Sequence, residues 1–288
     1  MKVLKFGGSS VASSENIKKV IKIVVDTAKK HKVLVIVSAF GKTTNALIGG
    51  AHFAQNKNKE YKNVIQQLEK HHFNVIQELI PAQKQPTIVA HVKELFNQLE
   101  TIYKGCYLLE ELSSKTLATI SSFGELLSSS IIAEVSNLEL DTNYKDSRDL
   151  IIASDMYLDA VVDFAATNKN ITAYFKNDTA QVTLLPGFVA LTNQGQTTTL
   201  GRGGSDYSAA IYAAALDAEE LQIWTDVSGM FTSNPSIVKQ AFAIPHISYH
   251  EAMELSHFGA KVIYPPTIQP VLQKEIPIVI KNTFQPED

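Results

Sequence analysis

The sequence predicts an α/β fold with a mostly parallel central sheet covered by helices on both faces. Short aliphatic runs, typical of buried strands, alternate with helical patterns along most of the chain. Two of these expected strands lead into glycine-rich turns that open helices, as in sheets that bind ligands beyond the carboxyl ends of their strands. A chain of 288 residues can bury a large core and suits one domain of two lobes better than two independent domains.

Six short apolar segments are expected to be strands, at 2–6, 33–38, 138–142, 181–185, 221–225 and 276–281. Helical patterns separate most of them. Between Ala46 and Ala133 no strand pattern occurs, and the text is helical with breaks expected at Pro81 and Pro86. We expect this stretch to be a helical insertion that forms part of the N-terminal lobe.

The stretch "TTTLGRGGSD" predicts a strand-to-helix turn with exposed amides. Gly201, Gly203 and Gly204 tolerate positive φ, and Ser205 and Asp206 are expected to cap the following helix. The start of a helix carries partial positive charge, so the turn is a candidate phosphate or carboxylate site. Taken alone, it is equally well interpreted as a capped turn without a ligand.

A second copy of this pattern favours the ligand. The stretch "VLKFGGSS" also joins an apolar strand to a glycine pair and two hydroxyl residues, before a helical pattern that begins near Glu15. Lys5, at the end of that strand, adds a compact positive charge. Two such turns can face one anionic ligand from opposite sides.

Other polar residues fall near the expected strand ends or in small, hydroxyl-rich surroundings. Ser38 and Thr44 follow one strand, Thr225 and Asp226 end another, and Glu125 lies in the helical stretch "SSFGELLSSS". Singly, each has an ordinary explanation as a helix cap, a turn residue or an exposed helix residue. Together they are better explained by a binding site.

Composition limits the partners. A net charge of −3 and a pI near 6.2 give no general attraction to nucleic acid or to an anionic membrane. The single Cys106 excludes an internal disulfide, and aliphatic runs such as "VLVIV" are strand-sized, too short to span a bilayer. Because the N-terminus enters a strand pattern rather than a signal sequence, we expect a reduced, cytoplasmic protein.

Seven motifs in order make the sequence similar to a known family: "KFGGSSVA", "VSAFGKTTN", "FGELLS", "PGFVA", "TTTLGRGGSD", "TDVSGMFTSNP" and "FGAKVIYPPT". The chain resembles the aspartate kinases of the amino acid kinase family from Met1 to about Lys281. The stretch from Ser248 to Val271 resembles most the kinase portion of bifunctional aspartokinase–homoserine dehydrogenases. The resemblance implies the amino acid kinase fold, with an aspartate-binding lobe over about 1–195 and a nucleotide-binding lobe over about 196–288.

The resemblance also implies a reaction. Aspartate kinases transfer the γ-phosphoryl group of ATP to the side-chain carboxylate of L-aspartate and form 4-phospho-L-aspartate, the first step towards lysine, threonine and methionine. ATP and Mg²⁺ would be the cofactors, with Mg²⁺ held through the ATP phosphates and by no protein metal site. The full-length protein would be a homo-oligomer.

Residue roles carry over by motif. Lys5 and Lys261 would neutralise the transferred phosphoryl group, and Asp206 would orient the lysines. Aspartate would be held by four side chains: Arg202 at its α-carboxylate, Glu125 at its ammonium group, and Ser38 and Thr44 at its side-chain carboxylate. The nucleotide and its phosphates would contact Gly7, Gly8, Ser9, Gly203, Gly204, Thr225, Asp226 and Phe231.

The reaction needs no general base. An aspartate side chain has a reference pKa of about 3.9 and is already ionised at neutral pH. Two anions must instead be brought together, so positioning and electrostatic stabilisation carry the catalysis. Lysines, exposed amides and Mg²⁺ are the expected means.

The sequence departs from the family pattern at five places. Ser9 replaces the usual threonine, Phe231 the usual tyrosine, and Tyr264 a common histidine. "NPS" stands where "DPR" is usual, so the loop arginine is missing at Ser236; Lys239 is close enough in sequence to be its substitute. The departures therefore fall mainly among the expected nucleotide contacts.

Several alternatives stay open. His246, His250 and His257 are a candidate zinc cluster, although surface or packing roles are favoured over zinc binding. Arg148 can reach a ligand or pair with a neighbouring aspartate. The protein can also be another amino acid kinase, acting on acetylglutamate or glutamate, or a catalytically silent nucleotide-binding subunit. Because the sequence ends at "IKNTFQPED", we expect an isolated kinase module without feedback control.

Overall fold

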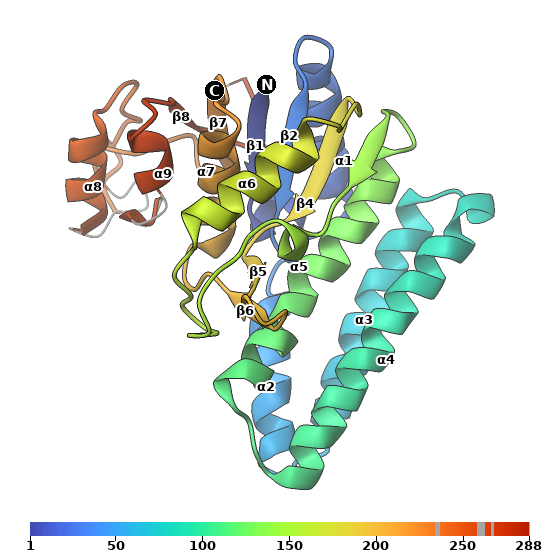
Figure 1. Ribbon diagram of the computed structural model, residues 1–288. Coiled ribbons are helices and arrows are strands. Elements are labelled where there is room, and N and C mark those ends of the chain that lie inside the picture. The colour runs from blue at the N-terminus through green and yellow to red at the C-terminus, as the bar shows by residue number, and fades with distance from the viewer. Residues whose placement is uncertain (234–236, 258–262, 266–267, 288) are drawn as a thin grey trace.

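A parallel six-stranded sheet forms the centre of the computed structural model, which describes residues 1–233, 237–257, 263–265 and 268–287 (Figure 1). The strand order is β3-β4-β2-β1-β7-β8, and every neighbouring pair is parallel. These strands are β1 (Lys2–Phe6), β2 (Val33–Val37), β3 (Thr142–Tyr144), β4 (Val182–Pro186), β7 (Glu220–Thr225) and β8 (Ile278–Asn282). A separate antiparallel pair consists of β5 (Val189–Leu191) and β6 (Thr197–Thr199).

The α-helices of the described residues are α1 (Ser14–Ala28), α2 (Thr43–Gln55), α3 (Tyr61–Leu79), α4 (Gln85–Leu109), α5 (Ser114–Ser136), α6 (Phe164–Phe175), α7 (Gly204–Ala215), α8 (Tyr249–His257) and α9 (Gln269–Leu272). Short 3₁₀ helices lie at Gly8–Val11, Ala82–Lys84 and Ser147–Asp149. The alternation of strands and helices confirms the predicted α/β class.

Helices cover both faces of the sheet because alternate residues of the central strands point to opposite sides. In β1, Leu4 and Phe6 pack into a cluster with α1 and α5, whereas Val3 packs into a second cluster with α6 and α7. All five residues of β2 are buried. This two-sided burial explains the continuous aliphatic run "VLVIV".

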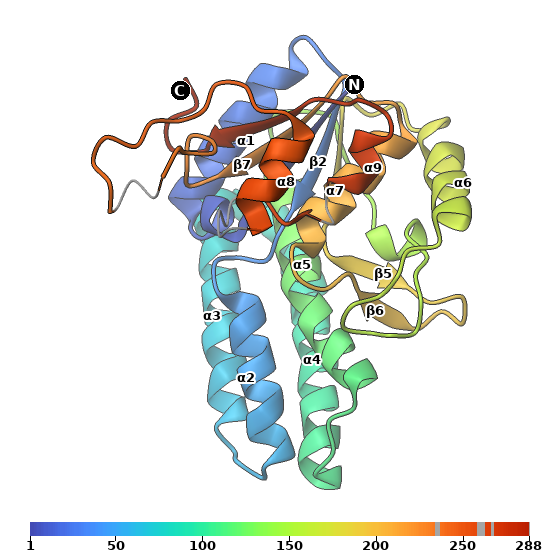
Figure 2. The same cartoon turned by 90° about the vertical axis from the view of Figure 1, so that its left-hand side faces the viewer.

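Four helices, α2 to α5, extend from the sheet as a bundle (Figures 1 and 2). The bundle and the sheet share one hydrophobic cluster. Gly50 of α2 lets α4 approach closely, since a Cβ there would lie 2.9 Å from the Tyr103 hydroxyl oxygen. That hydroxyl donates to the Leu47 carbonyl at 2.6 Å. The predicted helical insertion is confirmed, and it begins at the edge where the polar residues gather.

Most strand predictions hold, but two details are wrong. The strand expected at 138–142 begins only at Thr142, because α5 runs to Ser136 and the next residues form turns against its last carbonyls. Pro81 does follow a helix end. Pro86, in contrast, lies in the first turn of α4, where a missing N–H costs no helical hydrogen bond.

One described helix, α5, is long and apolar enough to cross a membrane by length and composition alone. Its candidate window is 83% buried inside the protein. The apolar residues of α5 thus face the sheet and the other bundle helices.

Candidate active site

The first glycine turn lies at the carboxyl end of β1. The Gly7 amide donates to the Trp224 carbonyl at 3.0 Å, which ties the turn to β7. Gly8 accepts from the Gly41 amide at 3.0 Å, and a Cβ at Gly8 would lie 3.0–3.1 Å from the carbonyl oxygens of Gly41 and Ala39. Glycine is required here because two backbones meet.

The second glycine turn opens α7. Gly203 is the N-cap residue with φ of 71°, and a Cβ on Gly204 would lie 2.7 Å from the Phe188 ring. The prediction that Ser205 and Asp206 cap this helix is wrong, since both lie within its first turn. The left-handed Gly203 begins the helix without a side-chain cap, which leaves the Asp206 side chain free for another partner.

That partner is Lys5. Its Nζ lies 2.6 Å from Asp206 Oδ1, and the two side chains are only 10% and 16% exposed. The contact is an ion pair rather than a well-directed hydrogen bond, because Asp206 Oδ1 has no hydrogen-bond partner. The two glycine turns, about 200 residues apart in sequence, are thereby joined by one charge pair.

A cavity of about 220 Å³ lies between the turns. It is lined by Lys5, Ser38, Thr44, Glu125, Phe188, Gly201, Gly203, Gly204, Ser205 and Asp206. Among the predicted site residues, the structure therefore brings together the first lysine, its carboxylate, two glycines and three of the four expected aspartate contacts.

Glu125 is the most unusual residue of the cavity. It is 4% exposed, and its Oε2 has no hydrogen-bond partner. Burial raises the pKa of this carboxyl to about 8, although backbone hydrogen bonds at Ala39 and at Glu125 itself, and the nearby Lys5 charge, oppose the rise. The alternative that Glu125 is an ordinary exposed helix residue is wrong. A buried carboxylate with a free oxygen at a cavity is suited to bind a cation.

The neighbours of Glu125 hold the end of β2 in place. A Cβ on Gly124 would lie 2.8 Å from Ala39 Cβ and 3.1 Å from Thr44 Oγ1, so α5 packs directly on the loop after β2. Ser128 Oγ donates to the Ser38 carbonyl at 2.8 Å. The N-cap residue of α2 is Lys42 and has no side-chain cap bond. Helix capping therefore does not explain Ser38 and Thr44.

Other predicted residues lie outside this cavity. Arg202 is exposed, with its guanidinium carbon 6.0 Å from the centre of the Tyr264 ring. At the end of β7, the Thr225 hydroxyl donates to Asp226 Oδ1 at 3.1 Å, and Phe231 forms a backbone bridge with Ala243.

The first glycine turn lies only partly at the cavity. Gly7 lies beside the cavity, since a Cβ there would be 3.6 Å from Lys5 Nζ, whereas Gly8 and the exposed Ser9 do not line it. Lys261 and Ser236 lie outside the described residues. All of the predicted nucleotide contacts are described residues, but of them only Gly203 and Gly204 line this cavity.

Three cavity or supporting residues were missed by the sequence reasoning. Phe188 and Ser205 line the cavity, and Ser128 holds the end of β2. Phe188 and Ser128 lie within "PGFVA" and "FGELLS", so their motifs were the available signal. Ser205 was considered only as a helix cap.

Two open alternatives can be compared with the described residues. They hold no group of three histidine, cysteine, aspartate or glutamate side chains placed to bind a metal ion, and the side chain of His257 is outside the description. Arg148 forms an ion pair with Asp146 at 2.7 Å, as the local alternative predicted.

Comparison with known proteins identifies the family. The model of the amino acid kinase family matches residues 1–282. The bifunctional aspartokinase/homoserine dehydrogenase of Buchnera aphidicola is 38% identical over 98% of this chain and 35% of its own length, and aspartokinase 1 of Arabidopsis thaliana is 33% identical over 99% and 50%. The chain thus spans between about a third and a half of these relatives.

A solved structure gives the same result. Escherichia coli aspartokinase III, in complex with aspartate and ADP, superposes with a TM-score of 0.91 at 30% identity, covering 99% of this chain and 62% of that one. The chain belongs to the amino acid kinase family.

Proposed function

We propose that this chain is an aspartate kinase catalytic module, which transfers the γ-phosphoryl group of ATP to the side-chain carboxylate of L-aspartate. The observation that carries the proposal is one small cavity with Glu125 buried in its wall and the Lys5–Asp206 pair beside it. Such a cavity offers a negative group for an ammonium ion and a positive group for an anion. The relatives named as aspartokinases, and the neighbour solved with aspartate and ADP, support it.

In this proposal Glu125 receives the ammonium group of aspartate, and the Ser38 and Thr44 hydroxyls donate to its side-chain carboxylate. Arg202 would take the α-carboxylate after leaving its position near Tyr264, at the mouth of the cavity. The ammonium group of the substrate, placed against Glu125, removes the cost of a buried unpaired carboxylate.

The phosphoryl donor would approach from the glycine turns. The amides around Gly203 and Gly204 and the start of α7 provide an electropositive seat for phosphates. Lys5 would shift from Asp206 towards the γ-phosphate, and Asp206 would keep the Lys5 ammonium group oriented towards that phosphate. Mg²⁺, entering with ATP, would supply further charge neutralisation.

The chemical step then balances without a base. An oxygen of the ionised aspartate carboxylate forms a bond to the γ-phosphorus, and the bond from that phosphorus to the bridging β-γ oxygen breaks. ADP leaves with the electron pair of the broken bond, and no proton moves. Lys261, Thr225, Asp226 and Phe231 stay proposed contacts of the phosphoryl group and nucleotide.

Two competing functions make different predictions. An acetylglutamate kinase would place an uncharged amide next to Glu125, so a buried carboxylate there would lack its cation. A silent nucleotide-binding subunit is suggested by the missing loop arginine at Ser236. Such a subunit, however, does not need Lys5, Asp206 and Glu125 to line one cavity.

One assay separates these functions. Purified protein is incubated with MgATP and either L-aspartate, L-glutamate or N-acetyl-L-glutamate, while ADP release is followed and acyl phosphate is trapped with hydroxylamine. We expect hydroxamate only with L-aspartate. Product with another acceptor would reassign the substrate, and a folded protein that binds ATP without any acceptor-dependent turnover would support the silent subunit.

A further inference from the structure

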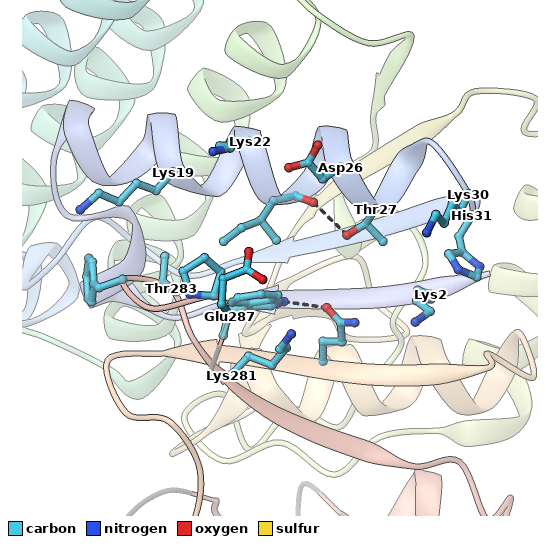
Figure 3. A pocket seen from close by; sticks show the side chains of 15 residues that line it. Lys2, Lys19, Lys22, Asp26, Thr27, Lys30, His31, Lys281, Thr283 and Glu287 are labelled. Atoms are coloured by element: carbon cyan, nitrogen blue, oxygen red, sulfur yellow. Dashed lines mark hydrogen bonds between the residues drawn. The ribbon is translucent and has the colours of Figure 1, made fainter.

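A second cavity, of about 570 Å³, lies on the α1 face of the sheet, opposite the face covered by α7 (Figure 3). Helix α1 forms one wall, β7 and β8 form the floor, and the last described residues close one end. It shares no lining residue with the candidate active site.

The cavity gathers positive charge in a protein that is negative as a whole. Its lining includes Lys2, Lys19, Lys22, Lys30 and Lys281, opposed by only two carboxylates, Asp26 and Glu287. Asp26 is already paired, since its Oδ1 lies 2.6 Å from Nζ of Lys29, which is outside the lining. With a net charge of −3 for the chain, this concentration of ammonium groups is local.

Four of these lysines form no ion pair within 4.0 Å among the described residues, although the charge of Lys22 is near enough to Asp26 to help lower the pKa of that carboxyl. The exception is Lys2, which lies 3.3 Å from Glu220. Lys281 instead lies over the Trp224 ring at 5.0 Å, and Lys19 over the Phe284 ring at 5.2 Å. Contact with an aromatic face leaves an ammonium group able to bind an anion.

The polar side chains on the β7 part of the floor, in contrast, are hydrogen-bonded to one another. Trp224 Nε1 donates to Gln222 Oε1 at 2.9 Å, and Gln222 Nε2 donates to Glu220 Oε1 at 2.6 Å. Trp224 is only 3% exposed, and its ring stacks on Phe6. A ligand would therefore be held by the lysine ammonium groups above a preformed floor.

We propose that this cavity binds a small polyanion, with several phosphate or carboxylate groups. The lysines come from α1, the turn after it, β1 and β8, so they can surround a ligand whose charge is spread over several groups better than a single ion. The recessed shape and the volume fit a small molecule. The proposal is independent of the kinase function, because it uses none of the residues assigned to that reaction.

Trp224 reports on the cavity because it is the only tryptophan of the chain. A polyanion that draws Lys281 away from the indole should change its emission. Sodium tripolyphosphate, citrate and inorganic monophosphate are titrated at constant ionic strength, without nucleotide. We expect Trp224 emission to change in a saturable way with tripolyphosphate or citrate, and whichever binds more tightly shows whether phosphate or carboxylate groups are preferred. Monophosphate should bind at least about tenfold more weakly.

Lysine variants locate the ligand, since the Trp224 carbonyl also contacts the Gly7 turn of the active site. The triple variant Lys19→Gln, Lys22→Gln, Lys281→Gln should weaken polyanion binding at least about tenfold. The matched control Lys18→Gln, Lys62→Gln, Lys115→Gln removes the same charge from exposed lysines outside the cavity and should bind within about twofold of wild type. Both variants should keep wild-type turnover in the aspartate kinase assay.

Equal affinity of the two triple variants would overturn the proposal, as would an emission change that does not saturate. Single-stranded DNA binding more tightly than tripolyphosphate, and lost in the cavity variant, would reassign the surface to a macromolecule. Circular dichroism checks that the variants fold. If the triple variant does not, Lys22→Gln alone should weaken binding about threefold, and no change there would equally reject the site.

Discussion

Glu125 links pH to substrate binding. Its carboxyl is protonated in the free protein up to about pH 8, because burial raises its pKa to about 8, yet it must be ionised to receive an ammonium group. We therefore expect the Michaelis constant for L-aspartate to fall as pH rises towards about 8. Initial rates at varied aspartate across this range measure it. A pH-independent Michaelis constant would remove Glu125 from the substrate site.

The matched substitution is Glu125→Gln, which keeps size and hydrogen bonding but not charge. Losing one charge-assisted hydrogen bond should cost about 1.5–3 kcal/mol, or roughly a tenfold to hundredfold higher Michaelis constant. The pH dependence of that constant should disappear in the variant. Ser130→Ala on the same helix, whose hydroxyl donates to the Leu127 carbonyl at 3.0 Å and lies outside the cavity lining, serves as the control.

The same carboxyl affects stability with a definite sign. Its pKa in the folded state lies above the ordinary glutamate value of 4.5, so the folded protein binds the proton more tightly than the unfolded chain. Its contribution to the free energy of unfolding is complete below pH 4.5 and is lost as pH rises through about 8. In urea unfolding at several pH values, the free energy of unfolding should decline less with rising pH in Glu125→Gln than in wild type. Equal declines would contradict the assignment of Glu125 as a buried carboxyl.

Lys5 should matter more for turnover than for aspartate binding. Its charge is used most as the phosphoryl group moves, so Lys5→Ala should lower kcat by at least about a hundredfold with a small change in the Michaelis constant for aspartate. Lys2→Ala, on the same strand but outside the lining of the candidate active site, is the control. Near-normal turnover of the Lys5 variant would exclude it from the chemistry.

At the scale of elements, the site depends on close contact between α5 and the loop after β2. Gly124→Ala should displace that loop, since its Cβ would meet Ala39 Cβ at 2.8 Å, and should destabilise the fold by about 1–3 kcal/mol while weakening aspartate binding. Gly105→Ala in α4 meets nothing within 4 Å and should stabilise by up to about 1 kcal/mol. Thermal unfolding and the aspartate assay compare the two. A Gly124 variant that behaves like the Gly105 control would show that the contact can relax.

The same elements show what the sequence could predict. Strand β1 and the position of both glycine turns were predictable, because a strand end and a glycine pair are local signals. The burial of Glu125 was not, since it depends on α5 packing against both the sheet and the other bundle helices, and a buried α5 has no amphipathic pattern to reveal its contacts. Likewise, local signals indicated a helix cap at Asp206, whereas its contact with Lys5, about 200 residues away in sequence, was implied only by the family resemblance, which has Asp206 orient the lysines.

At the scale of the molecule, the bundle and the sheet are expected to unfold together, because Phe96 and Tyr103 of α4 belong to the same hydrophobic cluster as Trp224 of β7. Phe96 is 1% exposed, so Phe96→Ala should cost about 3–5 kcal/mol. The loss should appear equally in Trp224 fluorescence, which reports on the sheet, and in far-ultraviolet circular dichroism, which is dominated by helices. Exposed Phe53→Ala is the control and should change little. Helical signal lost at lower denaturant than the fluorescence would show a separately unfolding bundle, and the loop after β2 on which α5 packs would then be the first part of the site to open.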